Sequence, residues 1–168
     1  MDMASLLEKG GWKVSREEKG KKPNGNKEDK NEIFFKTYLS GKNKYFLDDK
    51  KKQINSDFVD SYARELVAMF TSNRNKNKLT QLRGFYNAVC KIDSKLNGNN
   101  SSQIEFNDVK DKISMLKAYA KNKENNGVVS REFRKFIYQN VDAVKDKRDL
   151  KAFKIHFEAI MGYMPKDR

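Results

Sequence analysis

The chain of 168 residues is long enough for one domain with a hydrophobic core and too short for two. Its 36 Lys and Arg against 23 Asp and Glu give a net charge of +13, which favours a polyanionic partner, nucleic acid before acidic membrane. The single cysteine, Cys90, excludes an internal disulfide and a thiolate metal cluster. The sequence contains no run of about 18 apolar residues and no recognisable secretory signal, so we expect a cytoplasmic protein.

The first part of the chain differs in composition from the rest. Residues 20–31 contain almost no apolar side chains and are dense in Gly, Asn and Lys. Such a segment cannot bury enough surface to offset the entropy that is lost on ordering. We therefore expect residues 1–44 to form a basic, mostly disordered N-terminal extension, in which the apolar residues 33–35 could dock as an extended segment. Residues 45–168 are expected to form the folded domain.

From about residue 56 onward, apolar residues recur at the three- and four-residue spacing of amphipathic helices. No region shows the sustained alternation that is typical of strands, and no proline interrupts the chain between Pro23 and Pro165. The pattern predicts an all-α bundle of about five helices joined by short loops. The predicted helices span about 56–70, 78–96, 102–121, 130–144 and 149–161. Ser56, Thr80 and Asp149 are the predicted N-caps of the first, second and last helix.

The predicted helix at 78–96 has an apolar side and a basic side. The basic side is a row at intervals of four, made of Arg83, Asn87, Lys91 and Lys95. On an arbitrary helix such a row is more often a solvated face than a binding site. Other features of the sequence are needed to decide between a solvated face and a binding site.

Residues that could carry out catalysis are few. His156 is the only histidine, and we expect it on the helix surface or lightly buried. The acidic pairs Asp108/Asp111 and Asp142/Asp146 have spacings that more often serve solubility and pairing with lysine than metal binding. The sequence contains no glycine-rich phosphate loop. We therefore expect no cofactor, no metal site and no enzymatic activity.

Further basic side chains lie in the loop before the helix at 78–96 and on the helix at 130–144. If they converge on one face, they suit contacts to phosphates better than the recognition of bases, because lysine dominates. The candidate nucleic-acid-binding residues are Lys76, Lys78, Arg83, Lys91, Arg131, Arg134 and Lys135. Tyr86 and Tyr138 could stack on bases, although tyrosines at helical spacing more often lie half inside the core.

Several segments resemble the small subunit of the type III-A CRISPR effector, the Csm complex. They are Tyr-Phe-Leu-Asp at 45–48, Lys-Leu-Thr-Gln-Leu-Arg-Gly-Phe-Tyr at 78–86, Leu-Lys-Ala-Tyr-Ala at 116–120 and Phe-Lys-Ile-His-Phe-Glu-Ala-Ile-Met-Gly-Tyr at 153–163. The resemblance covers roughly residues 45–163. It implies a non-catalytic helical subunit that stacks in several copies beside the backbone subunits and contacts guide RNA and target RNA in antiviral defence. It implies no cofactor and no membrane partner.

Other classes of function stay open beside this one. A small metal-dependent nuclease would cleave RNA with Mg²⁺ or Mn²⁺, and a helical DNA-binding regulator would prefer one duplex sequence. An interaction module that binds no RNA also fits if the two sets of basic residues point apart. With the resemblance in hand, we expect the basic side of the helix at 78–96 to face RNA, and Arg83 is its first residue to test.

Overall fold

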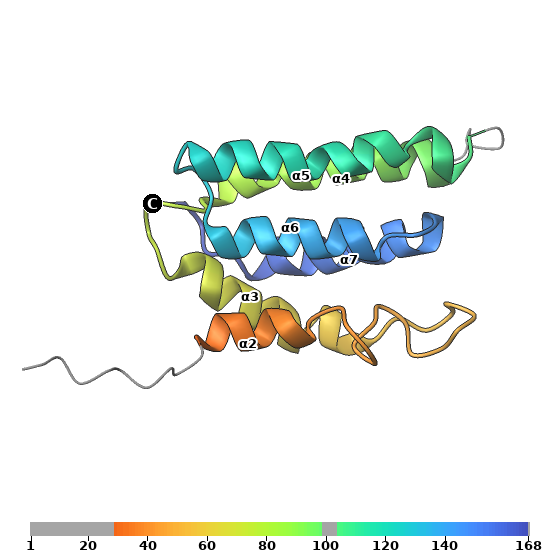
Figure 1. Cartoon of the computed structure of the whole chain (residues 1–168), viewed down its shortest axis with the longest axis horizontal. Helices are drawn as coiled ribbons and strands as arrows, with labels where there is room; N and C mark the ends of the chain where they lie inside the picture. Colours follow the sequence, from red (N-terminus) through yellow and green to blue (C-terminus); the bar gives the residue numbers. More distant parts are fainter. Residues whose placement is uncertain (1–28, 99–103, 168) are drawn as a thin grey trace, which may run out of the picture.

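A computed structural model describes residues 29–98 and 104–167, and within these ranges the regular structure is helical (Figure 1). The α-helices are α2 (Lys30–Thr37), α3 (Ser61–Thr71), α4 (Leu79–Asn97), α5 (Lys110–Asn125), α6 (Arg131–Ala143) and α7 (Lys147–Tyr163). Two 3-10 turns, η1 (Ser56–Phe58) and η2 (Phe106–Asp108), precede α3 and α5. The prediction of an all-α bundle is confirmed, and the five predicted helices correspond to α3–α7.

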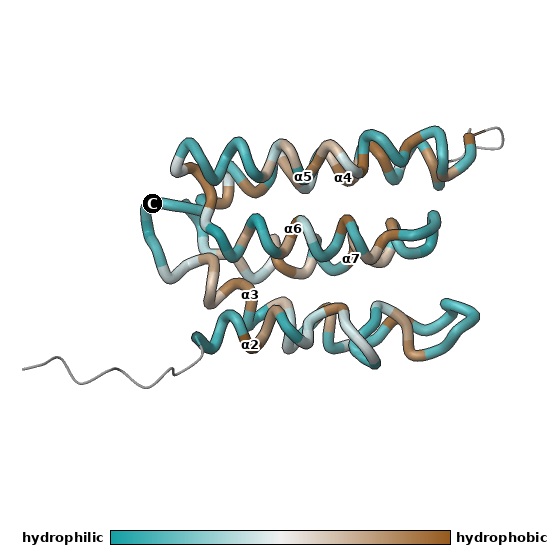
Figure 2. Tube along the Cα trace, viewed as in Figure 1, coloured by the Kyte–Doolittle hydropathy of each residue, from teal (hydrophilic) through white to brown (hydrophobic). Residues whose placement is uncertain are grey.

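The helices are stacked in three pairs (Figure 1). α4 and α5 form one outer pair, α6 and α7 the middle pair, and α2 and α3 the other outer pair. α4 packs mainly on α7, α5 on α6, and α3 on α7. Along the helices in Figure 2, brown apolar stretches alternate with teal polar ones, as expected for amphipathic helices with one buried side. None of the helices in the described ranges is long and apolar enough to span a membrane.

Aromatic rings fill the middle of the core. Phe70 of α3 meets Phe133 and Phe136 of α6, with ring centroids 5.3 and 5.7 Å apart. Phe136 also meets Phe157 of α7 at 5.2 Å. All three contacts are edge-to-face, a geometry that adds about 0.5–1.5 kcal/mol per pair beyond the apolar area buried. The cluster ties α3, α6 and α7 together and turns their polar sides outward.

Helix α2 departs from the expectation for the N-terminal part of the chain. Asp29 accepts a hydrogen bond from the backbone N–H of Asn31 at 3.1 Å and so caps the helix. Phe34, Phe35 and Tyr38 are buried in the same core as the bundle. The prediction that residues 33–35 dock as an extended segment was therefore wrong. Residues 1–28 lie outside the described residues, and the division of the chain at residue 44 stays a prediction.

The start of α4 is capped from the far end of the chain. The N-cap position is Lys78, and the backbone N–H groups of Leu79 and Thr80 donate to the Asp167 carboxylate at 2.6 and 2.8 Å. Thr80 is thus inside the first turn, and its prediction as the N-cap was wrong. These hydrogen bonds lower the pKa of Asp167, since they stabilise its charged form.

The other predicted helix starts are displaced along the chain. Ser56 begins the 3-10 turn η1 rather than α3. The predicted start near residue 102 lies outside the described residues, and α5 begins at Lys110. The N-cap of α7 is Asp146, whose side chain accepts from two backbone N–H groups, rather than Asp149. Asp149 is instead buried in the first turn of α7.

His156 lies inside a buried chain of hydrogen bonds. Its side chain is 0 % exposed, so the prediction of a surface or lightly buried histidine was wrong. Nδ1 donates to the carbonyl oxygen of Phe58, and Nε2 accepts from the Tyr38 hydroxyl at 2.6 Å. Burial lowers the pKa of His156 to about 4, so the ring is neutral near pH 7. Both ring nitrogens are therefore committed to the fold.

Candidate nucleic-acid interface

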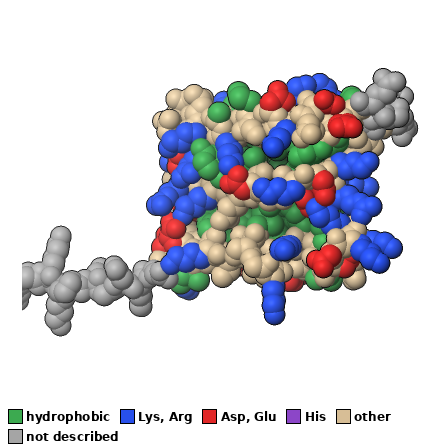
Figure 3. All heavy atoms as spheres, turned by 45° about the vertical axis from the view of Figure 1, so that its right-hand side comes forward, with side chains coloured by type: hydrophobic (Ala, Val, Ile, Leu, Met, Phe, Trp, Pro, Cys, Tyr) green, Lys and Arg blue, Asp and Glu red, His purple; other side chains and the backbone are tan. Residues whose placement is uncertain are grey.

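On the face shown in Figure 3, Lys and Arg side chains are spread out rather than gathered in one patch. They occur there on every level of the bundle, with Asp and Glu side chains among them. The predicted residues fall into three groups, on α6, in the loop before α4 and along α4 itself. What distinguishes these groups is whether a carboxylate already neutralises them.

The predicted cations on α6 are all paired within the molecule. Arg131 Nη2 and Lys135 Nζ lie 3.2 and 2.5 Å from the same Oε1 of Glu32 on α2. The hydrogen bond from Lys135 lowers the pKa of Glu32. Arg134 Nε lies 2.8 Å from Oε2 of Glu124 at the end of α5. A phosphate at α6 would have to displace these carboxylates, although partly exposed ion pairs are weak enough for that.

The loop before α4 is fixed by a buried asparagine. Asn77 has a φ of 56° and is 2 % exposed. Its backbone N–H donates to the Val128 carbonyl at 3.1 Å, and its side-chain oxygen accepts from the Ser130 N–H at 2.8 Å. Asparagine tolerates this left-handed conformation better than most residues. The loop is thereby tied to the start of α6, and Lys76 and Lys78 flank the anchored residue.

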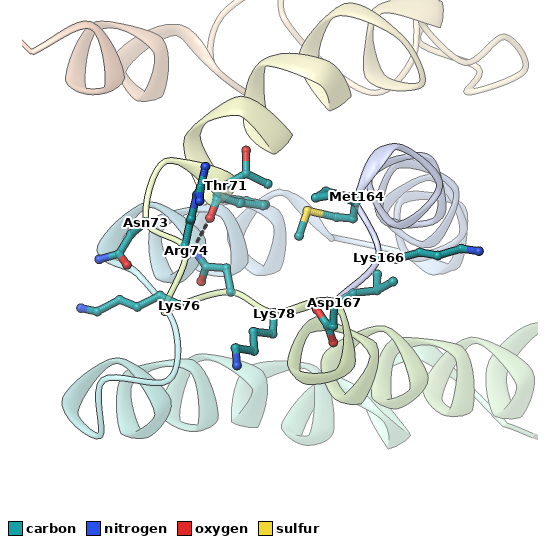
Figure 4. Close-up of a pocket in the computed structure, with 12 residues that line it drawn as sticks. Thr71, Asn73, Arg74, Lys76, Lys78, Met164, Lys166 and Asp167 are labelled. Atoms are coloured by element: carbon teal, nitrogen blue, oxygen red, sulfur yellow. Dashed lines mark hydrogen bonds between the residues drawn. The ribbon is translucent and has the colours of Figure 1, made fainter.

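A pocket of about 480 Å³ lies between this loop and the C-terminal residues 164–167 (Figure 4). Arg74, Lys76, Lys78 and Lys166 are among the residues that line it. In Figure 4, Lys76 and Lys166 extend in opposite directions from its edge. The pocket therefore has cations around its rim rather than a cluster of ammonium groups aimed at one point.

The outer side of α4 carries cations without carboxylates. Arg83 and Lys91 are exposed, and no carboxylate of the described residues forms an ion pair with either. The only acid in α4, Asp93, is buried and accepts from Lys154 of α7 at 2.9 Å. That hydrogen bond raises the pKa of Lys154. The positive charge of α4 thus stays unneutralised on the side that faces away from the core.

The α4 and α6 groups do not form one face. Phe85 of α4 and Phe133 of α6 touch across the core, with ring centroids 4.9 Å apart. Since these core sides face each other, the outer sides of the two helices point apart. What remains is a short line of cations on the outer side of α4, made of Arg83 and Lys91, which lie about 12 Å apart along the helix. Lys76 and Lys78 lie in the loop before this helix.

The two candidate stacking tyrosines are half-buried. Tyr86 contacts Phe157 of α7, with ring centroids 5.7 Å apart. The Tyr138 ring lies beneath the Arg134 guanidinium, whose Cζ is 5.0 Å from the ring centroid. A second cation, Lys117 Nζ of α5, lies 5.4 Å from the Tyr138 centroid, so the Tyr138 ring is already engaged by cations of two helices.

One pair of residues at this surface was missed by the sequence analysis. The side chains of Lys95 of α4 and Lys112 of α5 are close neighbours, and the nearby Lys112 ammonium lowers the pKa of Lys95. Two ammonium groups held side by side disfavour each other's charge. Lys95 was visible as part of the basic row of α4, but nothing in the sequence pairs α4 with the start of α5.

Comparison with protein families identifies the family of this chain. The family model described as Csm2 type III-A matches residues 52–164, which is more than half of the chain. The chain belongs to the Csm2 type III-A family. The expected relationship to the small subunit of the type III-A CRISPR effector complex is thereby confirmed. Searches among curated proteins and among solved structures found no match.

The Csm2 match covers α3–α7 and all seven candidate residues. It does not cover α2, so Glu32, the counter-charge of Arg131 and Lys135, comes from outside the matched range. Csm2 is a family of structural small subunits. In residues 29–98 and 104–167, no group of three or more His, Cys, Asp or Glu side chains is placed to hold a metal.

Proposed function

We propose that this Csm2 chain is a non-catalytic RNA-binding subunit that holds RNA phosphates on the outer side of α4 and on the loop before it. The observation that carries the proposal is that Arg83 and Lys91, on the outer side of α4, form no ion pair with a carboxylate of the described residues. In the loop before the helix, the charge of Lys78 is opposed by the nearby Asp167 carboxylate. Contacts from lysine and arginine to phosphates position a nucleic acid without reading its base sequence. Sequence is then read by base pairing between guide and target, as in other RNA-guided systems.

The α6 cations have a secondary role in this proposal. Arg131 and Lys135 share Glu32, and Arg134 is paired with Glu124. Each would gain less from a phosphate than an unpaired cation does, because an existing ion pair must first be broken. We therefore expect them to contribute less to RNA affinity than Arg83 and Lys91.

The partners follow from the family. As a Csm2 chain, the protein works with other subunits of the Csm complex. We extend this to guide RNA and target RNA as ligands and to further copies of the chain that stack beside the backbone subunits. A bundle with its cations on outer sides of helices is suited to line a groove that holds a duplex.

Charge reversal tests the proposed surface. Arg83→Glu and Lys91→Glu should each weaken RNA binding to a similar degree for all sequences, measured by fluorescence anisotropy with labelled RNA. With about four phosphates neutralised, log K should fall with log salt at a slope near −3, and each reversal should flatten that slope. Lys30→Glu makes the same change in net charge on α2, in the other outer pair of helices, and is the matched control.

The result can also go against the proposal. Equal weakening by Lys30→Glu and Arg83→Glu would mean that net charge alone drives binding. A flat salt profile would mean that phosphates are not the contacts. Cleavage of labelled RNA in the presence of Mg²⁺ or Mn²⁺ would favour the nuclease alternative. Loss of that cleavage in Arg83→Glu and Lys91→Glu would show that the outer side of α4 holds the substrate.

A further inference from the structure

A second row of side chains follows the seam between α4 and α5. Lys112, Met115, Tyr119 and Lys123 succeed one another at spacings of three and four, so they share one side of α5. This side faces α4, because the Tyr119 ring meets Phe85 with centroids 4.5 Å apart and Lys112 contacts Lys95. The antiparallel seam is thus lined by one row from each helix.

The apolar members of this row are open to solvent. Met115 is 64 % exposed and Tyr119 is 43 % exposed. The Tyr119 ring rests against Phe85, which fixes its position, and Lys123 Nζ lies 5.3 Å from the ring centroid. A tyrosine held in this way presents part of its ring outward at little cost in conformational entropy. Among the tyrosines near the α4 cations it differs from Tyr86, which is packed against α7.

Cations border this apolar stretch at both ends. Lys95 and Lys112 stand together at one end, and Lys123 stands at the other, about 16 Å away along α5. Glu124, the acid next to Lys123 in sequence, is engaged by Lys121 and Arg134 instead. Flat aromatic surface between cations is the combination that binds single-stranded nucleic acid, since bases stack and phosphates pair.

We propose that the seam between α4 and α5 binds a single-stranded segment of RNA, with a base stacked on Tyr119 and phosphates at Lys95, Lys112 and Lys123. The inference rests on the proposed RNA-binding function and adds to it a ligand class and a stacking residue. The adjoining Lys91 links this seam to the line of cations on α4. Met115, a polarisable side chain beside the ring, extends the apolar surface available to a base.

The test compares single-stranded RNA with a duplex of the same sequence. Tyr119→Leu keeps an apolar cover over Phe85 but removes the flat ring, whereas Tyr119→Phe keeps the ring. We expect Tyr119→Leu to weaken binding of single-stranded RNA roughly tenfold and to leave duplex binding almost unchanged, with Tyr119→Phe close to wild type. An oligonucleotide that contains 2-aminopurine should lose fluorescence on binding to the wild type and regain it with Tyr119→Leu.

Tyr163 provides the matched control. It is 42 % exposed and has the Arg64 guanidinium 5.0 Å from its ring centroid, but Asp60 lies beside it and pairs with Arg64. Tyr163→Leu should therefore leave binding of both RNA forms unchanged.

The outcomes separate this inference from the function on which it rests. If Tyr119→Leu binds single-stranded RNA like the wild type, or weakens both RNA forms equally, the stacking site is overturned while RNA binding stands. If Tyr163→Leu has the same effect as Tyr119→Leu, the effect is not specific to the seam, which also overturns it. If the wild type binds neither RNA form, both the inference and the RNA-binding function fall.

Discussion

Tyr38 donates its hydroxyl hydrogen to Nε2 of His156 over 2.6 Å and so joins the end of α2 to the middle of α7. The direction of this bond follows from Phe58, whose carbonyl oxygen can only accept and therefore requires the hydrogen on Nδ1. Asn140 of α6 extends the chain, because its amide donates to the Tyr38 oxygen at 2.9 Å and its carbonyl accepts from Tyr45. Residues before the family-matched range thus satisfy polar groups within it.

The buried histidine makes stability depend on pH. The pKa of His156 is about 4 in the folded chain, below its ordinary 6.5, so the unfolded chain takes up the proton first as the pH falls. This contribution to stability is complete above pH 6.5 and is lost as the pH falls towards 4. We expect the free energy of unfolding, measured by urea titration, to drop by about 2 kcal/mol between pH 7 and pH 5.

Because the chain has one histidine, a single substitution tests this prediction. His156→Gln removes the titrating group and should flatten the pH profile between 7 and 5, whatever its effect on absolute stability. The carboxylates with lowered pKa values, such as Glu32 and Asp146, act only at lower pH. A wild-type profile that is already flat in this window would contradict a buried neutral His156.

Truncation tests whether the N-terminal segment belongs to the domain. Removal of residues 1–44 deletes Phe34, Phe35 and Tyr38, which are 7, 5 and 1 % exposed. Burial of such rings contributes about 2 kcal/mol each, and the loss of Tyr38 also leaves His156 Nε2 without its partner. Since domains are stable by only about 5–15 kcal/mol, we expect the chain 45–168 to lack a cooperative thermal transition in circular dichroism.

The control is a chain that begins at residue 29, which should unfold like the full-length protein. Equal melting temperatures for 45–168 and the full chain would support the boundary that composition predicts. A cooperative transition in the chain that begins at residue 29, but not in the chain 45–168, would include α2 in the domain.

The long helices could be predicted because each contains its own signal. α3–α7 bury residues at regular helical spacing, so the sequence alone identifies them. α2 has eight residues and two adjacent phenylalanines in a polar segment, and it is stable because Phe34 and Phe35 pack on the bundle. Helix starts were less accurate for the same reason: the Asp167 cap of α4 lies 88 residues from Leu79.

The candidate site was predictable by residue but not by arrangement. A sequence gives the side of its own helix on which Arg83 or Arg131 lies, but not how two helices are rotated relative to each other. The contact between Phe85 and Phe133 fixes that rotation and sends the two basic groups apart. The burial of His156 likewise depends on Tyr38, 118 residues away in the sequence.

Asn77 is expected to control both stability and the position of the neighbouring lysines. Asn77→Ala loses the hydrogen bonds to Ser130 and Phe70 and places an alanine at a φ of 56°, for a cost of about 3 kcal/mol. Asn77→Gly loses the same bonds but tolerates the conformation, so it should be less destabilised. If urea unfolding shows that Asn77→Ala is more stable than Asn77→Gly, the left-handed backbone conformation is not the reason for asparagine at this position.

Gly84 provides a further test of the outer side of α4, where it follows Arg83. A methyl group added there meets nothing within 4 Å, and the same holds for Gly162 near the end of α7. Glycine inside a helix costs about 0.5–1 kcal/mol relative to alanine, so Gly84→Ala should raise the free energy of unfolding by that amount. If RNA approaches α4 closely at this point, Gly84→Ala should weaken RNA binding despite the added stability, whereas Gly162→Ala should leave binding unchanged. A Gly84→Ala variant that is more stable and binds RNA as tightly as the wild type would place the RNA backbone away from this turn of the helix.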